Sequence, residues 1–314
     1  MEGPNLTAVT EFILLGVTDL PELQALLFLL FLIVYLTSLL GNLGMIILIQ
    51  LNPKLQTPMY FFLRNLALTD VGYSTAVGPK MLANFVVDQN TISYYGCATH
   101  IAFSVVFIAY EVFILSVMSY DHYVAICNPL LYTVIMSPRL CWVLVGTPYL
   151  YCTFVSLLVT IKIFTLAFCG YNVISHFYCD TLPLISLVFS DTYEIELIIV
   201  IFAAFDFISS FPVVLMFYLL ILIAILRMKS AEGRHKAFFT CGSHLTMVTV
   251  FCGMLIFMYM QSKSHHSSDT DKVDSIFYTL VIPMLNPLIY SLRNKDEVKS
   301  ALYRIWNYLF ELCL

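Results

Sequence analysis

The chain has 314 residues, of which 60% are hydrophobic and only 11% are charged, and its mean hydropathy is +0.88. Soluble domains carry about 25% charged residues, so this composition excludes a soluble globular protein and indicates a membrane-embedded one. The formal net charge of -5 becomes informative only when the charged residues are assigned to the two sides of the membrane. We predict no nucleic-acid partner.

The amino-terminal segment does not have the pattern of a signal peptide. Residues 1–22 contain four acidic side chains and no lysine or arginine. The apolar run that follows, 23–51, is far longer than the roughly 7–15 apolar residues of a signal-peptide core. We therefore predict an extracellular tail over 1–22 and a first span that stays in the membrane. The sequon Asn5-Leu6-Thr7 predicts glycosylation of Asn5 on that side, and the alternative is an unmodified polar tail.

The apolar runs predict an all-α membrane protein, a bundle of seven transmembrane helices that forms one domain over residues 1–314. Each run is long enough to cross a hydrocarbon core of about 30 Å at about 1.5 Å per helical residue. The predicted spans lie near 23–50, 58–86, 97–124, 139–165, 194–226, 237–261 and 273–292.

Basic residues predict the orientation of the bundle. With the amino terminus outside, eleven lysines and arginines fall on the cytoplasmic side and four fall outside. Cytoplasmic loops are enriched in these residues, so we predict a multi-pass plasma-membrane protein, in contact with membrane lipids, whose N-terminus is extracellular. After the last span, Val298, Leu302 and Ile305 recur at helical spacing. They predict a short amphipathic helix over 294–311 on the cytoplasmic side, and a frayed tail is the alternative.

Three acidic residues, Asp70, Glu111 and Asp206, fall inside predicted spans. A charge at the centre of a bilayer costs about 3 kcal/mol even on lenient scales, so each of them needs a reason. A transporter could use such acids as a relay, but it would be built from internal repeats, and the sequence has no such symmetry. The sequence contains no nucleophile–base pair and no zinc-binding motif, so we predict neither an enzyme nor a metal site.

Five motifs in order resemble those of the vertebrate olfactory (odorant) receptor family, within the rhodopsin-like G-protein-coupled receptors. The resemblance covers essentially the whole chain. The motifs are Gly41-Asn42, Thr57 to Leu63 with Asn65 to Asp70, Met118 to Cys127, Lys236 to Leu245, and Pro283 to Asn294. The resemblance implies a receptor that binds small volatile molecules in a transmembrane pocket. It also implies activation of a stimulatory, olfactory-type heterotrimeric G protein, which raises cAMP.

The resemblance further implies a disulfide between Cys97 and Cys179, which would fix the second external loop over the pocket. The family usually adds a second bridge in this loop. Here Phe189 occupies the position expected for the partner of Cys169, so this chain departs from the pattern and we expect a looser loop.

A buried polar cluster is implied at Asn42, Asp70, Glu111 and Asn286. Two neighbouring carboxylates cannot both ionise cheaply without a cation, so we expect this cluster to hold a sodium ion or to share a proton. Our hypothesis is that the cluster is the core of the conformational switch. The alternative is that it only holds the helices together.

The ligand pocket is expected in the outer half of the bundle. Asp206 lies about three turns outward from Tyr218 and shares a helix face with Phe202. We expect Asp206 to select an amine or a hydrogen-bond donor, and the alternative is that it bonds a neighbouring helix. The other expected wall residues are Ser104, Val105, Ile108, Leu255, Tyr259, Tyr278 and Thr279.

The G-protein contact is expected at the inner end, where the family writes Asp-Arg-Tyr and this chain has Asp121-His122-Tyr123. Arginine is always charged and offers a rigid fork of donors, whereas histidine is shorter and mostly neutral near neutral pH. The alternative function is therefore a receptor that binds ligand but couples weakly. The resemblance implies that three further residues take part in G-protein coupling: Tyr218, Pro287 and Tyr290. Together with Asp121, His122 and Tyr123 they form the predicted coupling set.

Overall fold

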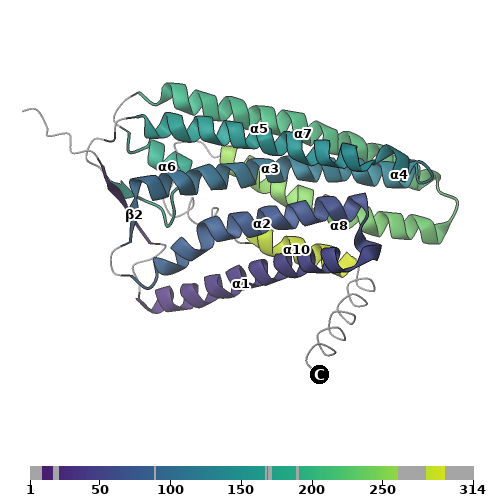
Figure 1. Ribbon diagram of the computed structural model, residues 1–314, viewed down its shortest axis with the longest axis horizontal. Coiled ribbons are helices and arrows are strands. Elements are labelled where there is room, and N and C mark those ends of the chain that lie inside the picture. Colours follow the sequence, from purple (N-terminus) through teal and green to yellow (C-terminus); the bar gives the residue numbers. More distant parts are fainter. Residues whose placement is uncertain are drawn as a thin grey trace, which may run out of the picture.

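The computed structural model describes residues 9–16, 21–87, 90–166, 168, 172–188, 191–260 and 281–293. Asn5, Cys169, Phe189 and the predicted helix over 294–311 lie outside these ranges. Within them, long helices run side by side in a bundle (Figure 1). Those of 12 residues or more are α1 (Pro21–Leu51), α2 (Pro58–Ala83), α3 (Tyr94–Cys127), α5 (Pro138–Phe164), α7 (Tyr193–Arg227), α8 (Ala231–Met260) and α10 (Ile282–Arg293).

Local sequence explains where several of these helices begin. Ser93 and Ser137 act as N-caps of α3 and α5, and their hydroxyls accept hydrogen bonds from the N–H groups of Gly96 and Leu140. Proline occupies the first turn of α2 and α5, where its missing N–H costs nothing. Among the described residues, α1, α3, α5 and α7 are long and apolar enough by themselves to cross a membrane.

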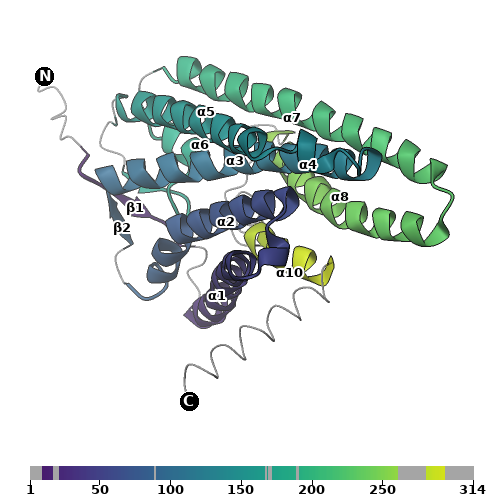
Figure 2. The same ribbon diagram turned by 45° about the vertical axis from the view of Figure 1, so that its right-hand side comes forward.

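Helix α3 lies at the centre of the bundle and contacts α2, α5, α7 and α8 (Figure 2). Helix α1 packs against α2 and α10. The contact between α1 and α10 depends on Gly41, because a Cβ atom there would lie 2.9 Å from Cγ of Pro287. A proline ring therefore sits directly against the backbone of α1.

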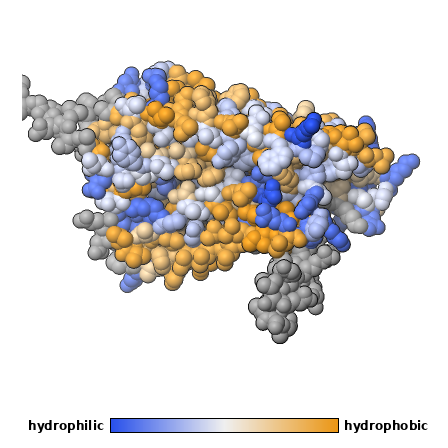
Figure 3. Space-filling model, in the orientation of Figure 1, coloured by the Kyte–Doolittle hydropathy of each residue, from blue (hydrophilic) through white to orange (hydrophobic). Residues whose placement is uncertain are grey.

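The sides of the bundle carry large hydrophobic side chains that no other part of the protein covers. Leu26, Leu40 and Ile208 are each more than 60% exposed. Figure 3 shows hydrophobic surface over the lengths of the helices, with hydrophilic side chains gathered towards the two ends. This pattern is suited to lipid along the sides and water at the ends.

A small sheet closes the end of the bundle at which α3 begins. Strand β1 (Glu11–Leu14) pairs antiparallel with β2 (Thr91–Ser93) and parallel with β3 (Val173–Ile174). Phe12 and Leu14 of β1 point into a buried apolar cluster. The sequence did not predict these strands, because segments of two to four residues are too short to show the alternation of apolar and polar residues that is typical of a strand.

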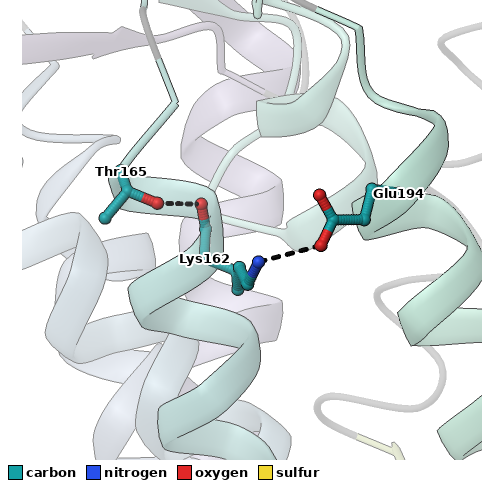
Figure 4. A network of polar contacts seen from close by, with 3 residues as sticks. All are labelled: Lys162, Thr165 and Glu194. Carbon is teal, nitrogen blue, oxygen red and sulfur yellow. Dashed lines mark hydrogen bonds and ion pairs between the residues drawn. The ribbon is translucent and has the colours of Figure 1, made fainter.

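Three short helical segments complete the described structure: η1 (Pro53–Leu55), α4 (Tyr132–Ile135) and α6 (Thr181–Ile185). At the sheet end, Lys162 of α5 forms an ion pair of 2.8 Å with Glu194 of α7, and the Thr165 hydroxyl donates to the Lys162 carbonyl (Figure 4). Both charged side chains are about half exposed or more, so the pair adds little stability.

Candidate functional site

The structure contains the disulfide that the sequence resemblance implied. Cys97 of α3 is bonded to Cys179, and their Cα atoms are 5.6 Å apart. The segment that carries Cys179 is also held by Asn84, whose side-chain amide donates to the Phe177 carbonyl at 2.8 Å. The segment is therefore fixed to both α2 and α3 at the sheet end.

The predicted pocket residues that the structure describes lie on α3 and α7, next to this segment. Ser104 is buried, and its hydroxyl has no hydrogen-bond partner among the described residues. Val105 and Phe202 pack against the buried cluster of the sheet end, and Ile108 packs against the larger core. Leu255 and Tyr259 belong to α8, but their side chains, like Tyr278 and Thr279, lie outside the described part.

Asp206 contacts a neighbouring helix. The hydroxyl of Tyr151 on α5 donates a hydrogen bond of 2.8 Å to Oδ1 of Asp206. This geometry favours the alternative stated above, in which Asp206 bonds another helix, over the selection of an amine ligand.

His100 is a polar residue in this region that sequence reasoning missed. It lies one turn from Ser104 on α3 and is 7% exposed, and its Nδ1 is 3.2 Å from the Cys179 carbonyl oxygen. Its Nε2 is buried with no hydrogen-bond partner in the described ranges. A buried polar atom left unpaired costs about 1–3 kcal/mol, so two of them one turn apart indicate a place for a polar group of a ligand. The sequence did contain a signal for this pair, because the spacing of His100 and Ser104 places them on the same face of a predicted helix.

The middle of the bundle contains the predicted polar cluster. The side-chain nitrogen of Asn286 on α10 lies 3.1 and 2.9 Å from the two carboxylate oxygens of Asp70 on α2, and 3.2 Å from Oε1 of Glu111 on α3. Asn42 of α1 donates to the Pro283 carbonyl at 2.9 Å. All four cluster residues are at most 5% exposed. The structure therefore brings Asp70, Glu111 and Asn286 together, whereas the bonds of Asn42 go to the Ser38 and Pro283 carbonyls.

This cluster is short of hydrogen-bond donors. An amide nitrogen carries two hydrogens, but three carboxylate oxygens lie around that of Asn286. The Oδ1 atom of Asn286 is buried and has no partner among the described residues. Carboxylate oxygens are ligands that a hard cation such as Na⁺ prefers, and a proton shared by the two carboxyl groups would remove the same repulsion.

At the inner end, Asp121 and His122 have different partners. The Tyr132 hydroxyl of α4 donates to Oδ1 of Asp121 at 2.7 Å. Burial and the Asp121 carboxylate raise the pKa of Tyr132 well above its usual value, which keeps the hydroxyl protonated as a donor. His122 instead turns back along α3, with Nδ1 2.6 Å from the Met118 carbonyl oxygen.

His122 also joins α3 to α8. Its ring stacks on that of His244 with centroids 5.0 Å apart and planes at 15°, and Nδ1 of His244 is hydrogen-bonded to the hydroxyl of Tyr218 on α7. All three residues are buried. His244 was part of a family motif in the sequence, but only the fold shows that it faces His122. The inner ends of α3, α7 and α8 are thus held by three rings.

Two further residues that were expected to contact the G protein have other neighbours in the bundle. Tyr123 packs against Phe217, with ring centroids 5.2 Å apart. Pro287 lies against Gly41 of α1. Tyr290 belongs to α10, and its side chain is outside the described part.

Comparison with known proteins shows the family of this chain. Residues 31–307 match the model of the family described as "Olfactory receptor". The chain is 73% identical to human olfactory receptor 8K3 over 98% of both chains, and 64% identical to human olfactory receptor 8K5 over 96% of this chain and 98% of that protein. It is also 57% identical to mouse olfactory receptor 8U3 over 96% of this chain and 94% of that protein. The chain therefore belongs to the olfactory receptor family, and it is a seven-transmembrane odorant receptor of the plasma membrane and not an enzyme.

Proposed function

We propose that a small odorant bound in the outer half of the bundle activates a stimulatory, olfactory-type G protein at the inner end and thereby raises cAMP. One observation carries this proposal. The single helix α3 presents His100 and Ser104 in its outer half, Glu111 in the middle polar cluster, and His122 among the rings of the inner end. A shift or rotation of α3 against its neighbours would therefore change the odorant region, the middle polar cluster and the rings of the inner end together.

The odorant end of this proposal rests on the two unpartnered atoms of α3. Nε2 of His100 and the Ser104 hydroxyl are buried beneath the segment that the Cys97–Cys179 disulfide holds. A small volatile molecule with one hydrogen-bonding group would satisfy one of them while its apolar part packs against residues such as Val105 and Phe202. We expect ligands with an alcohol, ketone, aldehyde or ester group.

The middle cluster acts as the switch core in this proposal. Asn286 is the described donor that links α10 to the carboxylates of α2 and α3. A sodium ion or a shared proton would stabilise the arrangement in the structure. Its loss would leave two charges facing each other and favour a separation of these helices.

Altered coupling at the inner end is the second candidate function, and a specific observation favours it. His122 is 3% exposed and stacks on His244, so it does not present a free cation to a partner protein. The G protein would then meet the surrounding basic residues instead. Such a receptor binds odorants but signals weakly.

Cells that express the receptor with a cAMP reporter test both candidates. A panel of volatile molecules is applied to the wild type, Ser104→Ala and Thr99→Val, with surface staining to equalise expression. Thr99 is the matched control because its hydroxyl lies on the exposed face of the same helix. Ser104→Ala should change potency for a responding odorant at least about tenfold, the effect of one lost hydrogen bond of about 1.4 kcal/mol, while Thr99→Val should not. A cAMP response that is absent for every volatile in the wild type but present in His122→Arg would establish the weakly coupled receptor.

A further inference from the structure

A cavity of about 390 Å³ lies at the inner end of the bundle, and none of the three rings of α3, α7 and α8 lines it. It is bounded by the last turn of α1, the segment η1, the first two turns of α2 and the start of α5. Three of its walls are therefore helix ends. The residues that carry the argument are Gln50, Gln56, Phe61, Arg64, Met136 and Trp142.

Arg64 gives this cavity a charge that has no ion-pair partner among the described residues. Its Nε atom is buried, and it has no hydrogen-bond partner among the described residues. The guanidinium lies over the ring of Phe61, with its central carbon 5.5 Å from the ring centroid. That contact orients the group but supplies no counter-charge, so an anion is needed to complete the site.

Among the described residues, no acidic residue lines the cavity. The carboxylate that acts on its lining residue Cys141 is that of Asp121, which accepts a hydrogen bond from the Tyr132 hydroxyl. Lys54 and Arg139 are sequence neighbours of the lining residues Leu55 and Pro138, and both are exposed. Within the described ranges, neither they nor Arg64 forms an ion pair. The cavity is therefore a basic pocket between helices, a type of site that binds the head groups of anionic lipids when it faces the cytoplasmic leaflet.

Depth and shape select a lipid rather than a soluble anion. Arg64 lies six residues inside α2, about 9 Å from its start, and Trp142 lies four residues inside α5, about 6 Å from its start. Tryptophan at such a depth is typical of the membrane interface. Trp142 lines the cavity and is 61% exposed, so the lining reaches the outer surface of the bundle at this depth.

We infer that this cavity binds the phosphate and glycerol part of an anionic phospholipid of the inner leaflet. The lipid phosphate pairs with the Arg64 guanidinium, and its glycerol esters meet the amides of Gln50 and Gln56. One acyl chain leaves the cavity across the face of Trp142. The site is separate from the odorant region and from the rings at the G-protein end, and it rests only on the inner end of the bundle facing the cytosol.

Tryptophan fluorescence tests this inference directly, because the chain has only two tryptophans, Trp142 and Trp306. The full chain with Trp306→Phe is reconstituted in vesicles in which a brominated phospholipid replaces part of a phosphatidylcholine background. Bromine quenches a tryptophan that touches the brominated chain. Brominated phosphatidylserine should quench Trp142 with an apparent association constant about fivefold that of brominated phosphatidylcholine, the effect expected of one basic residue near a lipid surface. Equal quenching by the two lipids overturns the inference.

Two variants and one soluble probe complete the test. Arg64→Gln in the same background should abolish the preference, whereas Arg227→Gln, the same change at the inner end of α7 and away from the cavity, should preserve it. Loss of the preference in both variants, or in neither, contradicts a site at Arg64. Inorganic phosphate added at 10-fold excess over the lipid should leave the preference in place; its loss would show a general phosphate site instead of a lipid site. The quenching of the parent receptor needs no substitution at Arg64, so the inference stays testable even when Arg64→Gln does not fold.

Discussion

The contact between Gly41 and Pro287 predicts opposite effects for two glycine-to-alanine substitutions on one helix. A Cβ atom at Gly41 would lie 2.9 Å from Cγ and 3.2 Å from Cβ of Pro287, whereas one at Gly44 would meet nothing within 4 Å. Alanine gains about 1 kcal/mol over glycine inside a helix, so Gly44→Ala should be neutral or stabilising. Gly41→Ala gains the same amount and loses about 1–3 kcal/mol to overpacking, because a proline ring cannot rotate out of the way.

The two variants should therefore differ by about 1–3 kcal/mol, which corresponds to an apparent Tm difference of roughly 2–5 °C for a protein of this size. The assay is thermal unfolding of both purified receptors in the same detergent at one heating rate. Gly41→Ala should also change basal cAMP, because it moves α10 and with it the link from Asn286 to Asp70. Equal Tm values, or a more stable Gly41→Ala, would refute the reasoning that α10 is seated against the backbone of α1.

Four further substitutions test the inner end, the middle cluster and the outer half of the bundle. His122→Arg should raise the maximal odorant-evoked cAMP signal at matched surface expression, because it restores a permanent cation; no gain would show that other inner residues already bind the G protein. Asp70→Asn and Glu111→Gln should each change basal or evoked cAMP, since either removes one of two facing carboxylates, and unchanged responses in both would leave the cluster as structural packing. Tyr151→Phe should lower the free energy of unfolding by about 1–3 kcal/mol without changing odorant potency, because it unpairs Asp206; a potency shift would return Asp206 to the pocket.

Sequence reasoning identified the parts of this receptor that depend on long patterns. Apolar runs predicted the fold class because a membrane requires about 20 apolar residues per helix. The disulfide and the middle cluster were implied by the family resemblance. The structure contains the disulfide and brings Asp70, Glu111 and Asn286 of the cluster together.

The parts that the sequence did not reveal depend on contacts between distant segments. His244 lies 122 residues from His122 in the numbering, and nothing in either motif states that their rings stack. The bond from Tyr151 to Asp206 depends on the rotation of two helices, which one sequence does not fix. The strand β1 forms only because β2 and β3 are brought to the same end of the bundle. The cavity at Arg64 likewise arises where separate helix ends meet.

The central claim is that an odorant in the outer half changes the arrangement of the inner end. Its most direct test is the distance between spin labels at Leu130, after α3, and Glu232, in the first turn of α8, both of which are exposed. The distance is measured by pulsed electron resonance with and without the most potent volatile from the cAMP screen, in a receptor whose Cys127, Cys169 and Cys313 are replaced by serine. The account predicts a longer distance with the odorant, as the stacked rings of His122 and His244 separate. An unchanged distance distribution at saturating odorant, in a receptor that still raises cAMP, would contradict it.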